Sequence, residues 1–318
     1  MDHRVKPGGD EVKVLHRASV LLRRGAIAVH LTTGRQAGAV IVERFGAWVR
    51  FGSAVLAPVV VVSALLAEAR NAAQAQSPEN PEIASRRAAE RKSFTDDEIK
   101  DGFFKIAFRA ELQFGRGDDR IRKFDEPVRV FVIDRGTPHR RAVVTAVVAD
   151  IRAHVDHLDL SMVDDAEHAN FVVTVVRHRD FARTIRSYYG AEKARQIQRS
   201  LRPQCLSGFG KDRNGRITRA EVILPSDVDD FSFYDCAYEE LLQPLGVIND
   251  DSSVPWTMFN DDVQMGFFDL YDQYLVNILY DPRIKPGMTK SEVNDLLPDV
   301  LPAVRAWASK ANGTEIGK

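Results

Sequence analysis

The stretch CAYEELLQPLGVINDD (residues 236–251) combines a helical pattern of apolar residues with polar side chains at regular spacing. Residues four apart lie on the same face of a helix, so Glu239 and Gln243 are expected to converge on one point. Gly246 predicts a turn with positive φ that ends the helix and brings Asn249 back toward that point. The stretch therefore predicts a helix that presents a polar site.

Extended and helical segments flank this helix, which is predicted over residues 231–246 and is expected to loosen at its proline. Before it, a turn of sequence RNG separates two extended arms, which is typical of a hairpin; the second arm is ITRAEVILP (217–225). After it come a loop over 249–262 and a helix over 267–280. We expect the second arm and the loop to border the helix.

The other predicted elements alternate between strands and helices and show no internal linker. They are a helix from the Thr95 capping box, strands over 127–134 and 170–177, helices over 141–157 and 181–201, and a C-terminal helix from the Thr289 capping box, interrupted at Pro298 and Pro302. The sequence thus predicts one α+β domain over 95–305 with a mixed sheet. A flexible linker over 76–94 precedes it, and a tail over 306–318 follows it.

Composition excludes some classes of function. The 318 residues have a formal net charge of −1 and show no basic patch interleaved with aromatic residues, so we expect no nucleic-acid partner. The mixed-charge helix over 192–202 is interpreted as a solvated face. The alternative is that Lys193, Arg195, Arg199 and Arg202 contact an anionic polymer of the cell envelope. The oligomeric state is not predicted.

The N-terminal region predicts export. An apolar run over 54–67 follows Arg44 and Arg50, and Ala73-Gln74-Ala75 is a small-x-small cleavage signal, as in a secretory signal peptide over 46–75. We expect cleavage after Ala75, a periplasmic or secreted protein, and no stable membrane span after cleavage. Residues 1–45 are interpreted as a non-native extension of the reading frame.

Cys205 and Cys236 are the two cysteines of the chain. In an exported protein an isolated pair forms one disulfide in the simplest case, and the alternative is a pair of buried free thiols. The bridge would close a loop of about 30 residues and tie the helix to the preceding strand.

The polar spacing resembles the zinc-peptidase pattern H-E-x-x-H-x-x-G-x-x-H, written here as E-E-x-x-Q-x-x-G-x-x-N. Glu240 matches the general-base glutamate, and Gly246 matches the turn glycine. Glu239, Gln243 and Asn249 match the three histidine ligands, and Asp250 follows directly. The resemblance implies a zincin-like fold in which a strand lining the cleft precedes this helix.

Further segments carry the same resemblance. Met258, in the sequence WTMF, occupies the place of the methionine turn of peptidases of the matrix-metalloprotease kind. CAYEELLQPLGVINDDSSVPWTMFNDD together with LYDPRIKPGM is similar to a bacterial family known as domain of unknown function 2927. That resemblance implies an exported protein with a degraded zincin-like motif and no established reaction.

The substituted positions change the metal chemistry that is expected. Catalytic zinc takes imidazole or thiolate ligands, whereas carboxylate and amide oxygens suit Ca²⁺, Mg²⁺ or Mn²⁺. We therefore expect no bound cofactor, with Glu239, Gln243 and Asn249 forming a hydrogen-bonded cluster. The alternative is a weak divalent-cation site that includes Asp250.

Two functions follow as hypotheses. The first is a non-catalytic protein whose cleft binds a peptide or a cell-envelope polymer, by strand addition at the edge of ITRAEVILP (217–225). The second is a peptidase-like hydrolase in which Glu240 is the general base beside a hard metal ion. A structural role for the helix is the third and least specific interpretation.

Overall fold

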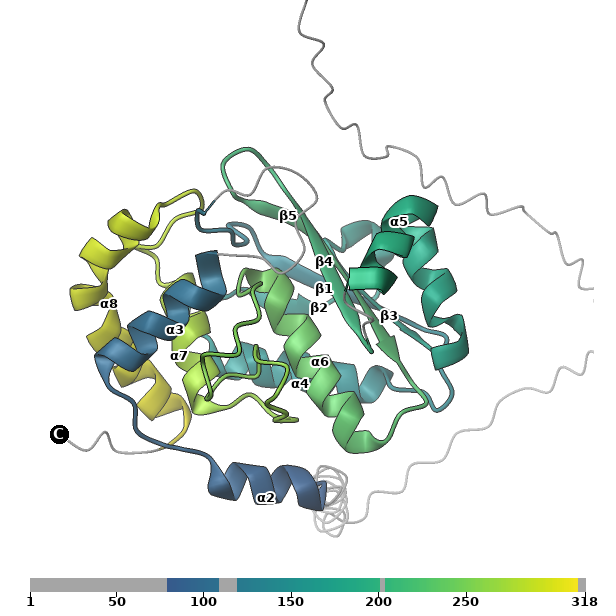
Figure 1. Cartoon of the computed structure of the whole chain (residues 1–318), viewed down its shortest axis with the longest axis horizontal. Helices are drawn as coiled ribbons and strands as arrows, with labels where there is room; N and C mark the ends of the chain where they lie inside the picture. Colours follow the sequence, from purple (N-terminus) through teal and green to yellow (C-terminus); the bar gives the residue numbers. More distant parts are fainter. Residues whose placement is uncertain (1–78, 109–118, 201–203, 314–318) are drawn as a thin grey trace, which may run out of the picture. The chain divides into compact units, whose positions relative to one another are not determined.

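The computed structural model describes residues 79–108, 119–200 and 204–313, and Figure 1 traces their path. The predicted extension (1–45) and the predicted signal peptide (46–75) lie outside these described residues. None of the helices among the described residues combines the length and the apolar character that a membrane span requires.

A five-stranded mixed sheet is the centre of the fold, in the order β2-β1-β3-β5-β4. Its strands are β1 (Val128–Asp134), β2 (Leu160–Met162), β3 (Phe171–Val176), β4 (Leu206–Lys211) and β5 (Ile217–Pro225). Neighbouring strands among β2, β1, β3 and β5 are parallel, and β4 is antiparallel to β5. The predicted α+β class and mixed sheet are confirmed, although the short β2 was not predicted.

The edge of the sheet differs from the prediction. The strand 217–225, expected at an edge, is the inner strand β5, with β3 on one side and β4 on the other. The first arm of the hairpin folds back against the second and so becomes the edge strand itself. The prediction that a ligand adds to the edge of 217–225 is therefore wrong, and the available edge is β4.

Helices cover both faces of the sheet (Figure 1). They are α2 (Pro81–Ala89), α3 (Asp96–Phe108), α4 (Arg141–His154), α5 (His178–Ser200), α6 (Asp230–Leu242), α7 (Leu270–Tyr280) and α8 (Lys290–Ala311), with 3₁₀ turns η1 (Ala166–His168) and η2 (Gln243–Leu245). Side chains alternate along β5: Val222 and Leu224 belong to the main core, whereas Ile223 packs in a second cluster with residues of α5. Helix α5 thus lies on one face of the sheet, and α6 lies on the other.

Two helical segments depart from the predictions. The linker predicted over 76–94 contains α2, which begins after the N-cap Asn80. Helix α8 is continuous, although Pro298 and Pro302 were expected to interrupt it. Both prolines are exposed, so the carbonyls that lose a hydrogen-bond partner can face water. The apolar stripe of α8, with Val293 and Leu297 buried, holds the helix against the core.

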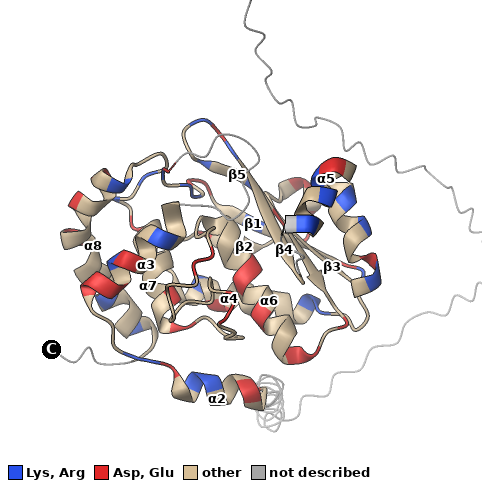
Figure 2. Cartoon of the chain, in the orientation of Figure 1, with Lys and Arg blue, Asp and Glu red and all other residues tan. Residues whose placement is uncertain are grey.

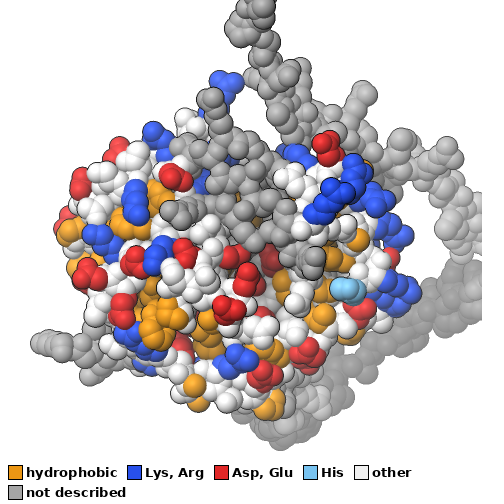
Figure 3. Space-filling model, viewed as in Figure 1, with side chains coloured by type: hydrophobic (Ala, Val, Ile, Leu, Met, Phe, Trp, Pro, Cys, Tyr) orange, Lys and Arg blue, Asp and Glu red, His pale blue; other side chains and the backbone are white. Residues whose placement is uncertain are grey.

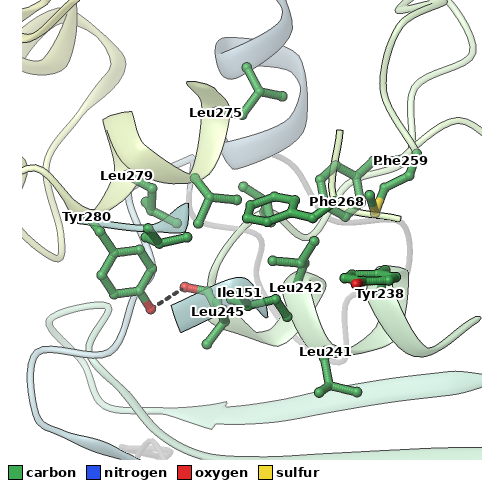
Figure 4. Close-up of a cluster of buried hydrophobic side chains, with 14 of the residues drawn as sticks. Ile151, Tyr238, Leu241, Leu242, Leu245, Phe259, Phe268, Leu275, Leu279 and Tyr280 are labelled. Atoms are coloured by element: carbon green, nitrogen blue, oxygen red, sulfur yellow. Dashed lines mark hydrogen bonds between the residues drawn. The ribbon is translucent and has the colours of Figure 1, made fainter. Parts of the chain in front are cut away.

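The main core fixes the C-terminal end of α6. Leu242, Leu245 and Leu279 are fully or almost fully buried there. Figure 4 shows them packed with aromatic side chains, and the hydroxyl of Tyr280 donates to the carbonyl of Leu245 at 3.0 Å. The residues that follow Leu245 therefore leave the helix from a rigid point.

Candidate functional site

Helix α6 is held against β4 by a covalent bond. Its N-cap Asp229 accepts a hydrogen bond from the backbone of Ser232 at 3.0 Å. Cys236, within the helix, is bridged to Cys205, with Cα atoms 5.9 Å apart. The predicted disulfide is confirmed. It places the face of α6 that carries Glu239, Glu240 and Gln243 beside the start of the edge strand.

The helix ends at the place that Pro244 and Gly246 predict. Regular α-helix stops at Leu242, and Pro244 lies in the following 3₁₀ turn, so the expected loosening before Gly246 is confirmed. Gly246 has a φ of 128°, and a Cβ there would lie 2.0 Å from the carbonyl oxygen of Arg122. Only glycine permits this close approach of two backbone segments.

Gln243 is fixed by two hydrogen bonds of opposite kind. Its side-chain oxygen accepts from the hydroxyl of Ser207 on β4 at 3.1 Å. Its side-chain nitrogen donates to the carboxylate of Asp250 at 3.0 Å. Gln243 therefore links the edge strand to the loop that follows α6, and the structure brings Gln243 and Asp250 together.

Asn249 points elsewhere. Its side-chain nitrogen donates to the carbonyl of Lys105 at 3.0 Å, and its backbone N–H donates to the carbonyl of Ile106 at 3.1 Å. It is buried and serves to dock the loop on α3. The predicted cluster of Glu239, Gln243 and Asn249 is thus not assembled as expected, and Asp250 takes the place beside Gln243.

Acidic residues gather at this end of α6 and in the loop after it, marked red on the ribbon in Figure 2, and Figure 3 shows acidic side chains on the same part of the surface. Glu240 is buried, and Glu239 is half-buried. Burial, followed by the charges of Glu240 and Asp250, raises the pKa of Glu239 well above its ordinary value. The C-terminal end of a helix carries partial negative charge, so acidic groups there are destabilising without a cation.

The side chain of Glu239 makes no hydrogen bond or ion pair within the described residues, and no basic residue lies in the last turn of α6. A positively charged group placed here would restore the ionised form of Glu239. The local arrangement is therefore suited to binding a cation or to exchanging a proton.

On the opposite face of β4 lie Tyr189 of α5 and Glu221 of β5, which the sequence patterns did not assign to the site. The Tyr189 hydroxyl on α5 lies over Gly208, where an added Cβ would come within 2.3 Å of it. Burial, and then the charges of Glu221 and Glu240, raise the pKa of Tyr189. Burial also raises the pKa of Glu221, which pairs with Gly208 across the strands. The glycines of β4 were the one signal of this close contact in the sequence.

The turn around Met258 is fixed by α7. Asp272 accepts hydrogen bonds from the Thr257 hydroxyl at 2.5 Å and from the Met258 backbone N–H at 2.8 Å. Met258 itself is buried in the main core. Asp269, the N-cap of α7, accepts from the backbone N–H groups of Tyr271 and Asp272 at 2.9 and 3.2 Å. Asp272 thus holds this turn, and Asp269 caps the helix that carries Asp272.

Replacing Asp269 by Asn is expected to stabilise the protein above neutral pH. Burial and the charge of Asp272 raise the folded-state pKa of Asp269 well above its unfolded value of 3.8. A group with a raised folded pKa contributes its full stability below the unfolded pKa and loses it as pH rises through the folded pKa. Asn stays neutral and remains a good N-cap, so urea unfolding between pH 5 and 9 should show a flatter profile for Asp269→Asn.

Asp229 provides the matched control, since it is also an N-cap. Its pKa is lowered by hydrogen bonds with Ser232, so its contribution is present above the unfolded pKa of 3.8 and is lost below it. Asp229→Asn should therefore gain nothing at pH 9. Equal pH profiles for wild type and Asp269→Asn would contradict the prediction.

The arrangement fits a three-ligand metal site poorly. Among the described residues, no group of three or more His, Cys, Asp or Glu side chains lies close enough to share a metal ion. Gln243 is already engaged by Ser207 and Asp250, and Asn249 is turned to α3. No chemical step is therefore assigned to a metal here.

A separate hollow of about 250 Å³ lies near the start of β1 and includes Lys123 in its lining. The Lys123 ammonium group is buried and donates to the carbonyls of Leu279 and Ile284 at 2.6 and 3.0 Å. Burial lowers its pKa to about 8. Because both carbonyls lie near the C-terminal end of α7, Lys123 serves to cap that helix.

Comparison with known proteins identifies one family. The family profile described as "Protein of unknown function (DUF2927)" matches residues 96–299. No curated protein matches the chain, and no solved structure does. The matched range includes the whole sheet, α6 and the turn around Met258.

Proposed function

Because the chain belongs to the DUF2927 family of proteins of unknown function, whose description names no activity, we propose its function from the site itself. The protein binds an extended polypeptide that pairs with strand β4. A basic group of that polypeptide lies against the carboxyl groups of Glu239, Glu240 and Asp250. The observation that carries the proposal is that the edge strand β4 is joined through the hydrogen bonds of Gln243 to a cluster of carboxyl groups.

The edge strand supports the choice of a polypeptide. Among the described strands, β4 pairs with β5 alone, so the backbone groups on its other side can pair with an added strand. Gly208 and Gly210 leave this strand with few side chains. A polypeptide backbone offers the matching series of donors and acceptors, which a polysaccharide lacks.

The carboxyl groups support a basic ligand. A cation near Glu239 lowers the raised pKa of this residue, so binding releases a proton. Affinity is therefore expected to increase as pH rises through the pKa of the free protein. Ser207, which holds Gln243 from β4, couples the position of the edge strand to that of the acidic group.

A peptidase-like architecture and an oxidising location belong to the same proposal. The antiparallel edge strand, α6 behind it, the Gly246 turn and the Met258 turn support the former. The Cys205–Cys236 bridge supports a periplasmic or secreted location, because disulfides persist in oxidising compartments. The predicted cleavage after Ala75 lies outside the described residues.

Hydrolysis with Glu240 as general base is the second candidate. The observation that favours it is the adjacent pair Glu239 and Glu240, in which the raised pKa of Glu239 allows one group to hold a proton while its neighbour accepts one. Binding is preferred because Gln243, which stands at a ligand position of the peptidase pattern, is locked by hydrogen bonds on both sides.

A peptide series tests the binding function. Capped decapeptides of strand-forming sequence, differing at one central position as Lys, Arg, Gln or Glu, would be titrated by calorimetry at several pH values. We expect the Lys and Arg peptides to bind about tenfold or more tightly than the Glu peptide, with proton release. Glu239→Gln should remove most of this preference, whereas the exposed control Glu167→Gln should keep it.

Hydrogen exchange locates the contact. Bound peptide should protect amides of β4 (Leu206–Lys211) but not those of β2 (Leu160–Met162), which is the other edge of the sheet. Protection at β2, or a preference that is unchanged in Glu239→Gln, would overturn the proposal. Mass spectrometry of the same mixtures tests for cleavage of the peptides. Cleavage by the wild type that is lost in Glu240→Gln would decide in favour of the hydrolase.

A further inference from the structure

Helix α5 presents a row of arginines on the face of the sheet opposite to α6. In its first half, Phe181 and Ile185 are buried in the second hydrophobic cluster. Arg179, Arg183 and Arg186 are exposed and are spaced four and three residues apart, so they share the outer face. Figure 2 marks Lys and Arg residues along this helix in blue, and Figure 3 shows basic side chains on the surface there.

The row continues beyond a break in the helix. Gly190 has a φ of 79° and separates two helical segments. In the second segment Ala194 and Ile197 are buried, and Arg195 and Arg199 are exposed four residues apart. Five arginines therefore line the outer surface of both segments, which we call the α5 arginine face.

Helix α5, which carries this face, has a strongly positive net charge, whereas the net charge of the whole chain is close to zero. Helix α5 has six Lys and Arg residues against two Asp and Glu residues, a net charge of +4, whereas the whole chain has −1. Arg179 and Arg183 are paired with Asp180, at 3.9 and 2.7 Å. Arg186, Arg195 and Arg199 form no ion pair with any residue that the structure describes. Much of the positive charge is thus available to a partner.

The side chains around these arginines narrow the class of partner. The exposed positions between them are small or polar, and no large apolar side chain is available for insertion into a bilayer. The two tyrosines of α5 are directed inward: the Tyr188 hydroxyl lies 2.7 Å from the Thr174 hydroxyl, and the Tyr189 hydroxyl lies over Gly208. Neither is free to stack on nucleic-acid bases.

We propose that the α5 arginine face binds a linear anionic polysaccharide through its carboxylate groups. Guanidinium groups bind carboxylates through paired hydrogen bonds, and a row of them along a helix matches a linear polymer better than a compact ligand. The surface lies on the face of the sheet opposite to the acidic site, so this interaction is independent of the peptide-binding function. It attaches the protein to a polymer and leaves β4 accessible.

Binding to polygalacturonate tests the proposal, measured by biolayer interferometry at low and high salt. The triple variant Arg186→Gln/Arg195→Gln/Arg199→Gln should bind about tenfold or more weakly and show a smaller salt dependence. A matched triple variant at exposed or half-exposed positions outside α5, Lys100→Gln/Arg135→Gln/Arg152→Gln, removes the same charge and should bind within about twofold of wild type.

Other polyanions distinguish the alternatives. Vesicles of phosphatidylglycerol and polyuridylate are measured in parallel, and each is expected to bind more weakly than polygalacturonate. Tighter binding to either one, lost in the α5 variant, would overturn the proposal in favour of a membrane or a nucleic acid. Equal losses in the two triple variants would also overturn the proposal, because net charge and not the α5 arginine face would then be responsible. The variant Arg186→Lys/Arg195→Lys/Arg199→Lys keeps the charge and should restore part of the binding, and urea unfolding of the Gln variant should match that of wild type.

Discussion

The Gly246→Ala variant is expected to lose about 3 kcal/mol or more of its free energy of unfolding. A φ of 128° is unfavourable for alanine, which alone costs about 1–3 kcal/mol. The new Cβ would also lie 2.0 Å from the Arg122 carbonyl oxygen and 2.9 Å from Leu279. Because the nearer atom belongs to the backbone, a chain segment has to move, and the core at the end of α6 opens with it.

Gly190→Ala separates the two contributions. Gly190 also has a positive φ, 79°, but an added Cβ there meets no atom within 4 Å. This variant should therefore lose about 1–3 kcal/mol, from backbone strain alone. Urea unfolding of both variants measures the difference. Equal losses at the two positions would show that the close approach to Arg122 is not tight in solution.

Gly246→Ala should also affect the site. The turn at Gly246 directs the chain toward Asn249, which docks on α3, and toward Asp250, which accepts from Gln243. We expect hydrogen exchange of residues 247–251 to increase more in Gly246→Ala than in Gly190→Ala. The peptide-binding preference should weaken in the first variant alone.

Removing the disulfide is expected to cost about 3.5 kcal/mol. Cys205 and Cys236 are 31 residues apart in sequence, and cross-linking a loop of this length restricts the unfolded chain by about that amount. The double variant Cys205→Ser/Cys236→Ser should therefore unfold at markedly lower urea concentration. The exchange of β4 amides should also increase, because the bridge is the covalent link between the start of β4 and α6.

Reduction of the wild-type protein is the internal control for this prediction. Chemical reduction breaks the same link without substituting any residue, so it should lower the free energy of unfolding by a similar amount. Adding the reductant to the double variant should have no effect. A loss below about 1 kcal/mol in both experiments would mean that β4 is held by its pairing with β5 and not by the bridge.

Features that depend on neighbouring residues were predicted well from the sequence. The capping boxes at Thr95 and Thr289 begin α3 and α8 as expected. The hairpin turn, the loosening at Pro244 and the glycine turn at Gly246 also follow the predictions. Each depends on backbone preferences or on hydrogen bonds over a few residues, and these are properties of a short segment.

The site was predicted only in part, because its residues meet across long distances in the sequence. Spacing alone could not show that Asn249 donates to Lys105, which lies 144 residues earlier, or that Gln243 reaches Ser207. Tyr189 and Glu221 belong to other elements and carry no motif. The continuity of α8 was likewise missed, because tertiary packing outweighs the preference of its two prolines.

The sequence by itself determined the amphipathic helix with its polar spacing, its end at Gly246 and, by having two cysteines, the partners of the disulfide. Tertiary structure decided that β4 and not β5 is the edge, that Asp250 and not Asn249 joins Gln243, and that the arginines of α5 form one outer face. The physical reason is that edge position, burial and charge clustering are set by which elements pack together. A helix or a turn needs only its own residues to be recognised.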